Sequence, residues 1–69
     1  MGVESVWAVQ AKRSLMKCVL HVEPTFTELL VLQDQDVAVR ETYPDCEQAR
    51  VKARALHDRL IEHGWRNAD

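Results

Sequence analysis

The order of hydrophobic and polar positions divides the chain near residue 44 into a part patterned for strands and a part patterned for a helix. Residues 3–43 are rich in valine, leucine, threonine and aromatic side chains, and three polar breaks separate four apolar segments. Short apolar runs bounded by turn residues are typical of strands. The pattern therefore predicts strands at about 3–10, 15–22, 26–33 and 36–43, joined in sequence order as an antiparallel meander.

Helical signals begin at Asp45, which can cap a helix, and continue with Glu47, an acidic residue favoured in the first turn. The apolar stripe expected at 3.6 residues per turn consists of Ala49, Ala53, Leu56 and Leu60. Gly64 is placed where a left-handed residue commonly ends a helix. We expect an α+β fold forming one small domain over residues 1–69, with a helix at about 46–63 packed on one face of the sheet.

The apolar run from Leu29 to Leu32 is uninterrupted, although the chain predicts only one helix to cover it. Successive strand residues point to opposite faces, so the run needs apolar cover on both sides of the sheet. A turn at residues 34–35 and a loop at residues 23–25 predict the register in which Leu30 and Leu32 face the helix. The predicted helix-facing side comprises Val3, Trp7, Val9, Met16, Cys18, Leu20, Val22, Phe26, Leu30, Leu32, Val37, Val39 and Tyr43.

The opposite face of the predicted sheet has an apolar centre and a polar margin. Its expected centre is Val6, Ala8, Val19, Leu29, Val31 and Ala38. A contiguous apolar patch rimmed by polar groups is typical of an interface, and the alternative is a solvent-exposed face of weak apolar content. We expect a partner here, a second copy forming a homodimer or another protein, because so short a chain buries only about 60% of its unfolded surface.

Charge is unevenly distributed along a chain whose net charge is -2. Residues 23–47 are acidic, whereas the segments before and after them are net basic. The acidic net charge argues against nucleic acid as the main partner. Nucleic-acid binding remains the alternative function, and it would use Lys12 and Arg13 at a predicted hairpin tip, with Lys17 close by and the sheet beside them.

Metal binding requires ligands that converge, and the sequence keeps its candidate ligands apart. Cys18 and His21 are three residues apart in a predicted strand, which sends them to opposite faces. His57 and His63 are six residues apart in the predicted helix, about 120° around its axis. We therefore expect no metal site and no cofactor.

Catalysis has three candidate residues. Glu28 and Glu41 come opposite each other in the predicted register, and paired carboxylates can serve as a general acid and base. The structural alternative is that a basic residue of the helix, such as Lys52 or Arg59, neutralises them. Cys46 at the helix start could have a lowered thiol pKa, but no base or second cysteine accompanies it. We expect a non-enzymatic protein.

Compartment is indicated by the first residues and by cysteine usage. The segment MGVESVW lacks the basic and apolar parts of a secretory signal, and no apolar run approaches the roughly 20 residues that span a bilayer. Two cysteines are too few for a disulfide framework. We expect a cytoplasmic protein with two free thiols and no membrane segment.

Overall fold

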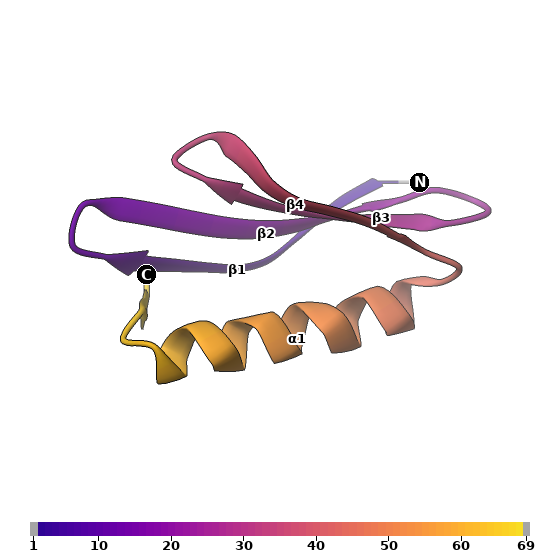
Figure 1. Ribbon diagram of the computed structural model, residues 1–69. Helices are drawn as coiled ribbons and strands as arrows, with labels where there is room; N and C mark the ends of the chain where they lie inside the picture. The colour runs from indigo at the N-terminus through magenta and orange to yellow at the C-terminus, as the bar shows by residue number, and fades with distance from the viewer. Residues whose placement is uncertain (1, 69) are drawn as a thin grey trace.

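The computed structural model describes residues 2–68 and confirms the predicted α+β arrangement (Figure 1). The elements in chain order are β1 (Gly2–Ala11), β2 (Ser14–Val22), β3 (Thr27–Gln33), β4 (Asp36–Tyr43), α1 (Cys46–Glu62) and β5 (Arg66–Asn67). They form one antiparallel sheet in the order β4-β3-β2-β1-β5, with α1 along one face. The two-residue β5, which the hydrophobic pattern does not predict, pairs with Val9 and Gln10 near the end of β1.

Both ends of α1 follow the signals in the sequence. The Asp45 carboxylate accepts a hydrogen bond of 2.9 Å from the backbone N–H of Gln48, which satisfies one of the first free donors of the helix. At the other end Gly64 has a φ of 98°, and its N–H donates to Ile61 while the N–H of Trp65 donates to Leu60. This pair of hydrogen bonds is a Schellman motif, which reverses the chain toward the sheet.

The core lies between α1 and the two central strands. Ala49 and Ala53 are fully buried, and they pack in a cluster with Cys18, Leu20, Leu29 and Val31. Their small side chains let the helix approach the strands closely. Trp7 fixes the contact from β1, because its indole Nε1 donates a hydrogen bond of 2.8 Å to the carbonyl oxygen of Ala53.

The register predicted for β3 is wrong by one residue. The loop after β2 spans four residues, closed by a hydrogen bond from the N–H of Glu23 to the carbonyl of Phe26, so that Val22 pairs with Thr27. Phe26 therefore lies in the loop and is 40% exposed. A slip of one residue exchanges the two faces of a strand.

As a result, the helix-facing side of β3 is formed by Leu29 and Val31, not by Leu30 and Leu32 as predicted. Val31 pairs with Cys18, and both side chains are buried beneath α1. Leu30 and Leu32 alternate with them and point to the opposite side of the sheet.

A bulge in β1 and another in β4 shift the registers of these two strands further. The pairing of β1 with β2 is irregular between Ser5 and Trp7, so Val6 is the extra residue. Beyond it Glu4, opposite the buried Leu20, faces the helix, and Val3, predicted to face the helix, is 69% exposed on the other side.

In β4 the extra residue is Ala38, because Leu32 pairs with Val37 whereas Val31 pairs with Val39. Val39 and Tyr43 pack against the core as predicted. Val37 was predicted on the same side, but it lies on the opposite face and is 51% exposed.

Replacing Gly64 by alanine should destabilise the protein by about 1 kcal/mol, because an L side chain at positive φ is strained. Chemical denaturation monitored by circular dichroism measures the change. Gly2→Ala is the matched control, since Gly2 has open space around its Cβ position and no positive φ. Equal effects of the two substitutions would contradict the structural role of the Gly64 turn.

Candidate interface on the outer sheet face

The outer face is the side of the sheet turned away from α1, and no element of residues 2–68 covers it (Figure 1). Besides Val3 at the start of β1, its apolar residues are Ala8, Leu15, Val19, Leu30, Leu32 and Val37, and these six we call the outer patch. Cross-strand pairs hold the patch together, because Val19 lies opposite Leu30 and Leu32 lies opposite Val37. The centre of the sheet thus presents aliphatic side chains on both of its faces.

Exposure varies strongly within the outer patch. Leu30, at the centre, is only 9% exposed, since its neighbours on β2 and β4 cover it. Val19 and Leu32 are half-buried, and Val37 on the edge strand is 51% exposed. Within the patch, a second layer over this face would therefore remove most apolar surface from water around Val37.

The margin of the outer patch carries charges of both signs. Glu28 and Arg40 form an ion pair of 3.7 Å at one end of β3 and β4. Lys17 is exposed beside Leu32, and His21 is half-buried beside Glu28. This margin is polar without being dominated by one sign of charge.

The predicted interface residues divide among three places. Ala8 and Val19 lie on the outer face. The prediction for Leu29 and Val31 is wrong, because the shifted register buries them against α1 at 0% and 3% exposure.

Val6 and Ala38, the other two predicted members, sit at the bulges of β1 and β4. Val6 packs toward the core cluster, and Ala38 lines a small apolar hollow beneath α1. Neither belongs to the outer patch.

Sequence reasoning placed Leu30, Leu32 and Val37 on the wrong side. The signal that could have corrected β3 is Pro24, because proline is favoured at the second position of a four-residue turn. A turn at residues 23–26 with Pro24 at that position gives the observed pairing. Val37 then follows from its pairing with Leu32, which the predicted turn at residues 34–35 already gives.

The basic residues of the alternative function lie at one end of the molecule. Lys12 and Arg13 form the exposed two-residue turn between β1 and β2, with Lys12 at a φ of 54°. Lys17 is separate from this tip and borders the outer patch. The structure therefore brings two of the three cations together at the tip and assigns the third to the outer face.

The carboxylate pair predicted from Glu28 and Glu41 does not form. The bulge at Ala38 sets Glu28 opposite Thr42, on the outer face, whereas Glu41 lies on the helix side and accepts a hydrogen bond from the Tyr43 hydroxyl. Burial and then this hydrogen bond raise the pKa of Tyr43 to about 12. No acid–base pair results, and the expected neutralisation by Lys52 or Arg59 has no pair to act on.

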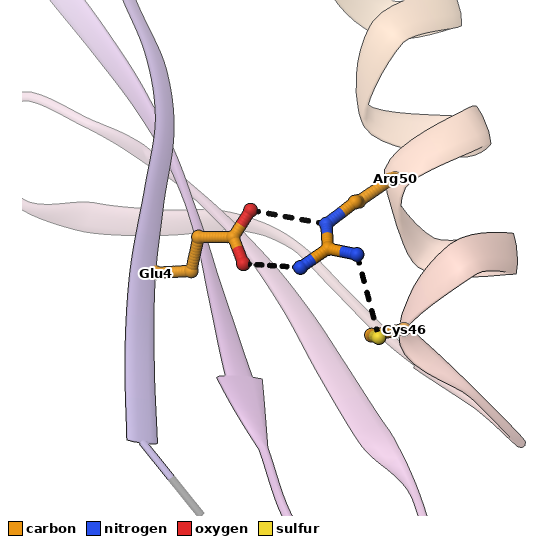
Figure 2. Close-up of polar contacts among 3 residues, drawn as sticks. All are labelled: Glu4, Cys46 and Arg50. Carbon is orange, nitrogen blue, oxygen red and sulfur yellow. Dashed lines mark hydrogen bonds and ion pairs between the residues drawn. The ribbon is translucent and has the colours of Figure 1, made fainter.

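A bidentate ion pair that the sequence did not reveal joins α1 to β1 (Figure 2). Arg50 donates from Nη2 to Glu4 Oε1 at 2.6 Å and from Nε to Oε2 at 3.1 Å, and its Nη1 lies 3.5 Å from the Cys46 sulfur. The hydrogen bond from Arg50 lowers the pKa of Glu4. Because the pair is solvent-exposed, it positions the helix more than it stabilises the fold.

Metal ligands do not converge anywhere in residues 2–68: this part of the chain holds no cluster of three or more histidine, cysteine or acidic side chains. The same residues include no helix with the length and apolar character needed to cross a membrane.

The two thiols, both free, should differ sharply in reactivity. Cys18 is buried, which raises its pKa to about 11, whereas Cys46 is half-buried at the start of α1. With a disulfide reagent at pH 8, we expect one thiol per native chain to react quickly and the second only on unfolding. Cys46→Ser should remove the fast phase, and a fast phase that survives this change would contradict the burial of Cys18.

The raised pKa of Cys18 also predicts a pH dependence of stability. The Cys18 thiol has a higher pKa in the folded state than the value of 9.0 that it has in the unfolded chain. Its contribution to the free energy of unfolding is therefore fully present below pH 9.0 and is lost as the pH rises through about 11.

Comparison with known proteins gives no relative for this chain. No family model matches it, and no curated sequence or solved structure is significantly similar to it. Its function is therefore inferred from the surfaces of the molecule itself.

Proposed function

We propose that the protein is a small non-enzymatic binding module that acts as a homodimer, with the outer faces of two copies packed against each other. The observation that carries this proposal is the outer patch itself, in which Val37 is 51% exposed beside Leu32 on a face that residues 2–68 leave uncovered. Two sheets packed face to face at about 10 Å form a common and stable arrangement.

The size of the molecule leaves room for an interface of the usual area on this face. A specific interface buries about 800 Å² per partner, roughly one sixth of the 4948 Å² of accessible surface on this chain. The Cα atoms extend over 37 × 21 × 19 Å, so the broad side of the molecule is of the required size.

The charges at the margin of the outer patch also favour a second copy of the chain as the partner. A twofold dimer places the same surface on both sides of the interface, so that surface must complement itself. Lys17 and Arg40 are basic and Glu28 is acidic, all on one face. A twofold rotation can therefore set a base of one copy opposite the acid of the other.

The sheet edges are poorer candidates for joining two copies. Bulges interrupt both outer strands, at Val6 and at Ala38, and such irregularities protect an edge against strand pairing. Arg54 borders the β1 edge, whereas Lys52 and Arg59 border the β4 side. Joining two β1 edges would bring the two copies of Arg54 together.

Nucleic-acid binding, the competing function, would begin at Lys12 and Arg13. The cations of α1 belong to the helix side of the sheet, whereas Lys17 borders the outer face, so these basic residues do not share one face of the sheet. A band shift with DNA or RNA at low salt that weakens steeply with added salt would favour this function over dimerisation.

Val37→Lys should weaken self-association by tenfold or more, on the order expected for placing an unpaired ammonium in an apolar interface. Sedimentation velocity over a wide concentration range measures the effect. Val51→Lys is the matched control, because Val51 is 63% exposed on α1 and should leave association unchanged.

Circular dichroism should show the same helix content in both variants, since neither side chain belongs to the core. A monomer mass for the parent protein that is independent of concentration up to millimolar would overturn the dimer.

A further inference from the structure

A hollow of about 540 Å³ opens to solvent between the edge of β1 and the neighbouring flank of α1. The polar and aromatic part of its lining consists of Ser5, Trp7, Arg54, His57 and Asn67. Among residues 2–68, β5 pairs only with Val9 and Gln10, so it stops short of this stretch of β1 and contributes only an end wall. The volume falls within the roughly 300–1,000 Å³ typical of small-molecule sites.

Three of these side chains hold one another in place. The Trp7 indole is tied to the carbonyl of Ala53 by its 2.8 Å hydrogen bond, and its ring lies 5.8 Å from the His57 ring at an angle of 52°. His57 Nε2 lies 2.7 Å from Asn67 Oδ1, and because an amide oxygen only accepts, Nε2 carries the proton. The wall formed by β1, α1 and β5 is therefore ordered before any ligand arrives, which lowers the entropic cost of binding.

The lining of the hollow contains hydrogen-bond donors and no acidic side chain. Arg54 is exposed and forms no ion pair within residues 2–68, whereas its neighbour Arg50 is engaged by Glu4. Asn67 uses its oxygen for His57, which leaves its amide N–H groups as donors. The acid nearest to His57 is Asp58, 3.8 Å from the other ring nitrogen, but it is 71% exposed and outside the lining.

We propose that this hollow binds a small ligand through a phosphate or carboxylate group, with the Arg54 guanidinium as the principal contact and the Asn67 amide beside it. A guanidinium presents paired N–H donors that match the oxygens of either group. The hollow is larger than the anionic group alone, and the remainder of the ligand lies against the Trp7 indole.

The test is a titration of the full chain with inorganic phosphate and, separately, with acetate, at an ionic strength held constant with sodium chloride. Proton–nitrogen NMR spectra should show saturable shifts at the Trp7 indole N–H, the Asn67 side-chain amide and the backbone of residues 5–8. The anion that saturates at the lower concentration identifies the ligand class.

Arg54→Gln should weaken the binding about tenfold, as expected for losing a charge-assisted hydrogen bond. Arg59→Gln, on the opposite flank of α1, is the matched control and should leave the titration unchanged. The absence of saturable shifts with both anions, or equal shifts in Arg54→Gln and the parent, would overturn the proposal.

The hollow lies at the β1 edge of the sheet, where it shares Ala8 with the outer patch, whereas Val37 lies on β4 at the opposite edge and outside the lining. Val37→Lys should therefore titrate like the parent protein, whatever its oligomeric state. The dimer proposal and the anion-binding proposal can therefore be contradicted independently of each other.

Discussion

The contact of Ala49 and Ala53 with the sheet is the interaction on which the rest of the structure depends. Both alanines are fully buried against side chains from β2 and β3, and a single helix can cover only one face of these strands. Every residue that alternates with the covered ones must then face the other way. The aliphatic outer patch is the direct consequence of a sheet whose central strands are apolar on both sides.

The bulges at Val6 and Ala38 adapt the outer strands to this arrangement. In β1 the extra residue allows both Glu4 and Trp7 to face the helix, one forming the ion pair with Arg50 and the other the hydrogen bond to Ala53. In β4 it keeps Val39 on the core side although Val37, opposite the outward Leu32, faces the other way. The same irregularities that complete the core also make the sheet edges unsuited to pairing.

Element order and both helix ends were predictable from sequence because they depend on local signals, such as Asp45 and Gly64. The faces of β3 were not, because Leu29 to Leu32 are apolar at every position and hydrophobicity cannot choose between two registers one residue apart. That choice depends on the turn around Pro24. The bulges carry no glycine, so Val6 and Ala38 were misplaced, whereas Val37 was misplaced together with Leu32, with which it pairs. Only Ala8 and Val19 of the predicted interface were assigned to the correct face.

The reversal at Gly64 links the end of the helix to the wall of the hollow. The turn returns the chain to the sheet, where Asn67 pairs with Val9 in β5 and also contacts His57 of α1. Fraying of the last helical turn would therefore displace a wall of the hollow, and occupancy of the hollow would oppose that fraying by mass action. Local unfolding of the carboxyl-terminal segment and ligand affinity are in this way coupled equilibria.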